Sequence, residues 1–164
     1  AIVQGIIKDC GITLKDVVNT ASSVSDNRYS NNLSINAIDY VNATSVGNNA
    51  MTNCISLTNV NMPVVTSVGG YAMANCILLT SVNMPAVTSI STYAMQNCIS
   101  LKSVRLGANQ VATLANANAF ANTPIAKATG YIYVPDELVD SYKKATNWSV
   151  YADQIRPMSE CEVE

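Results

Sequence analysis

Three cysteines offer the most obvious chemistry in this chain, because they recur at a constant spacing. Cys54, Cys76 and Cys98 lie 22 residues apart, so a structure that repeats with the same period places their thiols in one column. Such a column could bind a metal ion or form a disulfide. Zinc sites, however, use short Cys-x-x-Cys spacings and usually four ligands, and three thiols in a column cannot all pair. We therefore predict buried, reduced thiols, with no metal and no other cofactor.

The two remaining cysteines, Cys10 and Cys161, lie near the two ends of the chain. We expect no disulfide between them, and the total of five cysteines is odd.

The residue types and motifs of the chain give little indication of a catalytic site. The chain has no histidine, which excludes a histidine-based triad or dyad, and no nucleophile elbow or phosphate-binding loop occurs. Asp136, Glu137 and Asp140 come nearest to the carboxylate pair of a glycosidase. Acidic residues at the start of a helix are already explained by the helix dipole, so we predict no catalytic residue and no enzyme.

The charge pattern excludes further classes of function. Charged residues make up 12% of the chain, against about 25% in ordinary soluble domains, and residues 40–101 contain none. A net charge of −2 gives no basic surface for nucleic acid. No apolar run approaches the ~20 residues of a membrane-spanning helix.

An internal repeat of 22 residues explains the uncharged stretch. Residues 44–65 read TSVGNNAMTNCISLTNVNMPVV and residues 66–87 read TSVGGYAMANCILLTSVNMPAV, with 16 of 22 positions identical. Residues 88–109 and 22–43 keep the same register with lower identity. A period of 20–29 residues is typical of a leucine-rich-repeat solenoid, in which stacked units bury a shared core. A charge repeated at one position would face its own copy ~5 Å away. The uncharged stretch therefore carries mostly asparagine, threonine and serine at its polar positions instead of charged residues.

These patterns predict an α/β repeat solenoid: a short, right-handed leucine-rich-repeat stack of about four to five units with parallel strands and a helical C-terminal cap. Val82–Met84 and Val68 mark two short extended segments per unit, and Tyr71–Cys76 is expected to form one helical or 3₁₀ turn. We place an off-register N-terminal cap at 1–21, four regular repeats at 22–109, an irregular fifth repeat at 110–135, the helical cap at 136–157 and a tail at 158–164. Asp136 is expected to cap the first helix of the C-terminal cap.

Polar residues between the inward strand positions are the candidate partner-binding residues. Solenoids commonly bind on such an outward strand surface, and neutral amides and hydroxyls are cheaper to desolvate than charges. The alternative is that these side chains only keep the sheet hydrated. The candidates are Asp39, Asn59, Asn61, Thr80, Ser81, Asn83, Lys102, Ser103 and Arg105.

A second candidate surface is apolar. Ile55, Ile77 and Ile99 share one column, with Leu33 in the preceding unit and Leu78 alongside. If exposed, this apolar ridge would exceed an ordinary surface patch and mark an interface. The alternative is partial burial beneath the turn that leads into each strand. Met51, Met73 and Met95 form another column, which we predict to fill the core.

The repeat resembles a known family. TSVGGYAMANCILLTSVNMP (residues 66–85) is similar to the BspA-type leucine-rich repeat, whose units run close to TSIGxYAFxNCxSLTSIxIP. The segment NAFANTPIAKATGYIYVPDELVDSYKKATNWSVYADQI (residues 118–155) resembles the closing unit of such proteins from gut Firmicutes and their prophages. Methionine replaces the usual phenylalanine, and isoleucine occupies a usually polar position. The resemblance implies a secreted or surface-displayed binding module without enzymatic activity, and it implies no particular ligand.

These observations lead to one functional hypothesis and one alternative. The leading hypothesis is a non-enzymatic extracellular recognition or adhesion module that binds a host or microbial protein or glycan through the outward strand face. The alternative is a structural spacer or display module of a prophage or surface appendage. We expect an extracellular or cell-surface monomer with no nucleic-acid partner.

Overall fold

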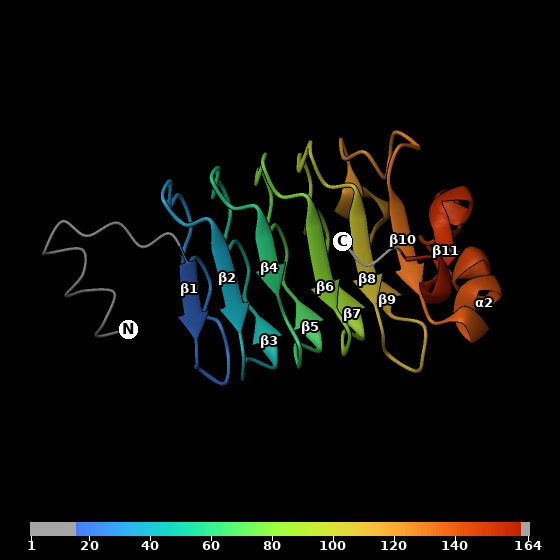
Figure 1. The fold of residues 1–164 in the computed structure, drawn as a ribbon, viewed down its shortest axis with the longest axis horizontal. Helices are drawn as coiled ribbons and strands as arrows, with labels where there is room; N and C mark the ends of the chain where they lie inside the picture. Colours follow the sequence, from blue (N-terminus) through green and yellow to red (C-terminus); the bar gives the residue numbers. More distant parts are fainter. Residues whose placement is uncertain (1–15, 162–164) are drawn as a thin grey trace, which may run out of the picture.

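The computed structural model describes residues 16–161 and shows a stack of repeated units built on two parallel sheets (Figure 1). A seven-stranded sheet has the order β1-β2-β4-β6-β8-β10-β11, and a four-stranded sheet has the order β3-β5-β7-β9. The strands of the larger sheet are β1 (Asp16–Asn19), β2 (Ala37–Tyr40), β4 (Asn59–Asn61), β6 (Ser81–Met84), β8 (Ser103–Leu106), β10 (Tyr131–Val134) and β11 (Ile155–Pro157). Those of the smaller sheet are β3 (Ser45–Val46), β5 (Ser67–Val68), β7 (Ser89–Ile90) and β9 (Thr113–Leu114).

The helices are short and lie toward the C-terminal end of the stack (Figure 1). They are the 3₁₀ helix η1 (Ala117–Phe120), the 3₁₀ helix η2 (Asp136–Leu138), the α-helix α2 (Val139–Lys144), and the 3₁₀ helices η3 (Ser149–Gln154) and η4 (Met158–Glu160). The predicted stack of parallel strands with a helical C-terminal cap is therefore confirmed.

The 22-residue period sets the strand register. Val60 pairs with Val82, and Val82 pairs with Val104, so equivalent residues of successive units lie next to each other. Pro85 follows the last residue of β6, as expected for a residue with no N–H to donate to the ladder. Equivalent side chains of the regular units consequently stack into columns.

The core consists of these stacked apolar columns. The predicted thiol column and the predicted methionine column are both fully buried, and each buried aliphatic side chain contributes about 1.5–3 kcal/mol. The fully buried columns include Cys54, Cys76 and Cys98; Met51, Met73 and Met95; and Leu57, Leu79 and Leu101. The side chains that were expected to fill the interior therefore do so.

Each buried thiol donates a hydrogen bond to a backbone carbonyl of the preceding unit. Cys76 Sγ lies 3.2 Å from Met51 O, and Cys98 Sγ lies 3.0 Å from Met73 O. Cys54, Cys76 and Cys98 are all free thiols, which confirms the prediction of reduced cysteines. Burial, together with the neighbouring Cys76 thiol, raises the pKa of Cys54 to about 12. Cys10 lies outside the described residues.

The turn before each strand is built on asparagine in the left-handed backbone region. Asn53, Asn75 and Asn97 have φ of 61°, 61° and 60°, a conformation that asparagine tolerates better than most residues. Their side-chain amides bond to one another: Asn75 Nδ2 donates to Asn53 Oδ1 at 2.9 Å, and Asn97 Nδ2 donates to Asn75 Oδ1 at 2.8 Å. Asn31 and Asn122 extend this asparagine ladder at its two ends. In the regular units, Tyr71–Cys76 and its equivalents form hydrogen-bonded turns instead of a helix.

The N-terminal end of the described chain differs from expectation. β1 falls within the segment predicted to be an off-register cap, yet it pairs in parallel with β2, Asp16 opposite Ala37. The buried amide of Asn19 donates to the Tyr29 hydroxyl at 2.8 Å and ties this strand to the next unit. Residues 16–19 therefore form a strand of the main sheet, whereas residues 1–15 of the predicted cap lie outside the described part.

The C-terminal cap closes the core with aromatic side chains. Trp148 is fully buried, and its indole Nε1 donates to Ala112 O at 2.6 Å. The Tyr142 ring meets it edge to face at 5.2 Å, and the Tyr142 hydroxyl accepts a hydrogen bond from Ala112 N. The indole N–H and the phenol hydroxyl therefore each have a hydrogen-bond partner, although both rings are buried.

Asp136 does not cap its helix, contrary to the prediction. Pro135 occupies the N-cap position of η2 and makes no side-chain cap. The Asp136 carboxylate instead accepts a hydrogen bond from Ser159 N at 3.0 Å. Hydrogen bonds from the Ser159 side chain and backbone lower the pKa of the Asp136 carboxyl. The Asp136 carboxylate therefore holds the segment that follows β11. The predicted helical cap did not include this strand.

Candidate functional site

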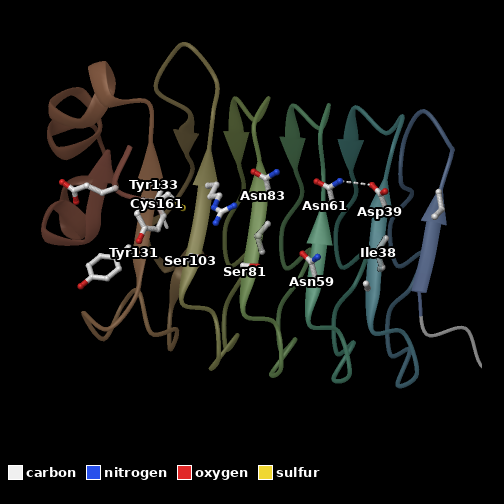
Figure 2. A pocket seen from close by; sticks show the side chains of 15 residues that line it. Ile38, Asp39, Asn59, Asn61, Ser81, Asn83, Ser103, Tyr131, Tyr133 and Cys161 are labelled. Carbon is white, nitrogen blue, oxygen red and sulfur yellow. Dashed lines mark hydrogen bonds between the residues drawn. The ribbon is translucent and has the colours of Figure 1, made fainter. Parts of the chain in front are cut away.

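A groove of about 850 Å³ runs across the outward face of the seven-stranded sheet (Figure 2). We call it the strand groove. Its floor consists of side chains that alternate with the buried residues of each strand, because successive residues of a strand point to opposite faces. Two columns result, one following Asp39 and one following Ala37, and Figure 2 shows their polar members as two rows across the strands.

The Asp39 column carries the charges of the groove floor. Asp39 pairs with Asn61, Asn61 with Asn83, and Asn83 with Arg105 in the strand register. Three steps of ~4.8 Å place Asp39 and Arg105 ~14 Å apart. Asn61 Nδ2 donates to Asp39 Oδ1 at 3.1 Å, so this carboxylate is held in place by its neighbour. The column thus presents an acid, two amides and a guanidinium in sequence.

The Ala37 column is made of small and neutral side chains. Asn59, Ser81 and Ser103 follow Ala37 along the register. These four side chains are neutral, and alanine and serine are smaller than the side chains of the Asp39 column, so the groove is deeper here. A ligand can therefore approach the backbone of the sheet on this side.

Two tyrosines close the groove at its C-terminal end. Tyr131 pairs with Ser103 and Tyr133 pairs with Arg105, so each tyrosine continues one of the columns. Their ring centroids lie 6.3 Å apart, and the Arg156 guanidinium lies 5.0 Å from the Tyr131 ring centroid. Tyr131 is 40% exposed. Glu160 and Cys161 complete this end of the lining.

Seven of the predicted partner-binding residues line this groove. They are Asp39, Asn59, Asn61, Ser81, Asn83, Ser103 and Arg105. Thr80 and Lys102 are exposed but precede their strands and are not among the lining residues. The Thr80 hydroxyl donates to Thr58 O at 3.3 Å, which explains a threonine at this position without any ligand.

Further exposed or partly exposed residues line the groove and were not predicted from the sequence, among them Val18, Tyr131, Tyr133, Glu160 and Cys161. The alternation of Tyr131, Ile132, Tyr133 and Val134 matches the outward–inward pattern of the earlier strands, and this signal was sufficient to add both tyrosines. No comparable signal exists for Glu160 and Cys161, because they reach the groove only through the path of η4.

The apolar ridge is exposed and lies apart from the groove lining. Ile55, Ile77 and Ile99 are 39%, 38% and 57% exposed. Leu33 and Leu78 are also exposed. The ridge therefore has the accessibility that an interface needs, and its role stays a prediction. Tyr71 and Tyr93 stack nearly parallel in another column, with centroids 5.0 Å apart.

Two further classes of site receive no support from the described residues. Residues 16–161 contain no cluster of three or more His, Cys, Asp or Glu side chains able to hold a metal ion. Within the same range, no helix combines the length and apolarity needed to cross a bilayer.

Comparison with known families gives a match to repeated sequence over most of the chain. Residues 17–139 match the family described as the BspA type leucine rich repeat region, in six copies. A comparison with curated proteins gives no match. The matched region begins in β1, which agrees with the finding that this strand belongs to the repeat stack.

Proposed function

We propose that this chain, which belongs to the BspA-type leucine-rich repeat family, is a recognition module that holds a macromolecular partner in the strand groove. Leucine-rich repeats are interaction modules and the family is typically non-enzymatic. The proposed role is adhesion or recognition outside the cell, by a monomer displayed at the surface or secreted. The association of this family with surface proteins supports that location.

The observation that carries this proposal is the state of the amides on the groove floor. Asn59 and Asn83 are exposed, and no side-chain hydrogen bond joins either of them to another of the described residues. The asparagines of the asparagine ladder, by contrast, bond to one another. The fold thus explains the asparagines of the ladder, whereas Asn59 and Asn83 in the groove keep side-chain donors and acceptors for a partner.

A spacer or display role is the alternative. It is supported by the continuous ladders of hydrogen bonds between units, which make the stack a rigid rod independent of any ligand. This alternative predicts that the groove side chains can be replaced without functional loss.

A binding screen separates the two roles. The wild-type chain is applied to arrays of purified extracellular proteins and of oligosaccharides, beside the double variant Asn59→Ala/Asn83→Ala. The matched control is Asn109→Ala/Gln110→Ala, which removes two exposed amides outside the groove. Binding that the first variant loses and the control keeps supports the proposal. Binding that both variants keep refutes the groove assignment, and binding to nothing on either array favours the spacer.

A further inference from the structure

The centre of the strand groove has a chemistry that narrows the class of its partner. Between its two ends, the floor presents Asn59, Asn61, Ser81, Asn83 and Ser103. These side chains are neutral, and each amide or hydroxyl can both donate and accept hydrogen bonds. No apolar side chain projects from this central part of the floor.

A protein partner would call for a different centre. Protein interfaces concentrate aromatic, methionine and other apolar anchors in their desolvated core and place polar groups at the rim. The strand groove has the reverse arrangement, with neutral polar groups in the middle. Val18, which is 66% exposed, is an exposed aliphatic side chain of the groove lining, and it lies on β1 at the end of the groove, outside this centre. The three isoleucines of the apolar ridge, Ile55, Ile77 and Ile99, lie outside the groove.

The spacing of the polar groups suits a ligand that carries many hydroxyls. Equivalent side chains recur every ~4.8 Å across the strands, so a chain laid across the sheet meets donors and acceptors at regular intervals. Asp39 adds a carboxylate that Asn61 already orients. A carboxylate has about four acceptor positions, so it can still accept hydrogen bonds from hydroxyl groups of a ligand.

The tyrosine end supplies the apolar contact that such a ligand needs. Tyr131 is 40% exposed, and Tyr133 lies beside it with the two rings inclined at 56°. The Arg156 guanidinium lies over the Tyr131 ring, 5.0 Å from its centroid, so a ligand has to contact the part of the ring that Arg156 leaves exposed. The face of an aromatic ring is electron-rich, and it attracts the polarised C–H groups of a sugar ring. One sugar ring can thus pack on tyrosine while the next ones meet the amides.

The charges argue for a neutral ligand. Asp39 lies on the groove floor, and Glu160 lies at the tyrosine end. Arg105 lies on the floor between them, and Arg156 lies against the Tyr131 ring. Two acids and two guanidinium groups give a polyanionic chain no net attraction, because its gain at each cation is offset at a carboxylate. A neutral chain meets neither effect.

We infer that the partner of the strand groove is a neutral oligosaccharide, which packs one ring on Tyr131 and hydrogen-bonds to Asn59, Asn61 and Asn83. This inference rests on the proposed function, because it names the ligand class of the same groove. It assigns to Tyr131 a binding role that the repeat pattern alone does not give it.

The test uses printed arrays of neutral oligosaccharides, sialylated and sulfated oligosaccharides, and extracellular proteins, probed with the whole chain. We expect retention on neutral oligosaccharides that changes little between low and high salt. Asn59→Ala/Asn83→Ala should weaken that binding at least ~10-fold, because each lost hydrogen bond to the ligand reduces affinity several-fold. Asn109→Ala/Gln110→Ala should bind like the wild type.

A second pair of variants isolates the ring. Tyr131→Ala should abolish measurable binding to the neutral oligosaccharides, whereas Tyr131→Phe, which keeps the ring, should retain most of it. Circular dichroism confirms that each variant is folded. Binding that depends on Asn59 and Asn83 but selects only proteins or only acidic oligosaccharides overturns the inference and leaves the proposed function standing. Binding to no array removes both.

Discussion

Replacing Asn75 by alanine tests the asparagine ladder at its centre. Asn75 donates to Asn53 at 2.9 Å, accepts from Asn97 at 2.8 Å, and has a φ of 61°. The substitution removes two hydrogen bonds, each worth about 0.5–1.5 kcal/mol, and leaves alanine in the left-handed region at a further cost of about 1–2 kcal/mol. The free energy of unfolding should therefore fall by about 2–5 kcal/mol.

A glycine variant separates the two contributions. Asn75→Gly removes the same hydrogen bonds, but glycine adopts a positive φ with little cost. It should therefore be more stable than Asn75→Ala by about 1 kcal/mol. The assay is urea unfolding followed by circular dichroism, with the free energy extrapolated to water.

A glycine variant that unfolds at the same urea concentration as the wild type would contradict this prediction, because the ladder would then contribute nothing to stability. Equal stability of the alanine and glycine variants would instead remove the backbone contribution. Asn109→Ala, an exposed position without a positive φ, is the control and should change the free energy of unfolding by less than about 0.5 kcal/mol.

Three other substitutions or conditions test the stack. Met73→Asp should leave no folded protein by circular dichroism, because it places a charge in a fully buried column, whereas Met73→Leu should cost less than about 1.5 kcal/mol; a folded aspartate variant would show that the column is misassigned. Gly69→Ala should lower the melting temperature more than Gly70→Ala, because its Cβ would lie 2.6 Å from the backbone of Gly47, against 3.3 Å from a side-chain oxygen at Gly70; the opposite order would contradict the close approach. Unfolded thiols have a pKa of about 8.5, whereas the pKa of Cys54 in the fold is about 12. The contribution of the Cys54 thiol to the free energy of unfolding, measured with urea, should therefore be complete below about pH 8.5 and be lost as the pH rises toward 12. A Cys54→Ala variant with the same pH profile as the wild type would show that Cys54 does not cause this loss.

The sequence predicted the core because it is the most repetitive part of the molecule. A residue repeated every 22 positions lies above its own copy, and an uncharged apolar residue in such a column has to face inward. Cys76 and Met73 could therefore be placed in the core without coordinates. Asn61 and Asn83 could likewise be placed on the outward face, because they alternate with inward positions of their strands.

The rest could not be read from the period because it departs from it. Asp16 pairs with Ala37, 21 residues away, so β1 is out of phase with the repeat. Ile132 pairs with Ile155 across three intervening helices, so no repeat spacing indicated β11. Asparagine is common in solvated loops as well as in ladders, so the bonds between Asn53 and Asn75 required the observed positive φ before they could be recognised.

The side-chain amides of asparagine offer the most direct test of the central claim, that the strand groove is the binding surface. The chain is labelled with ¹⁵N and titrated with the oligosaccharide that the array retains best, while the Nδ2 signals are followed by NMR. We predict shifts at Asn59 and Asn83 and unchanged signals at Asn53 and Asn75, whose amides are engaged in the ladder. Shifts at the ladder with silent groove amides would contradict the account.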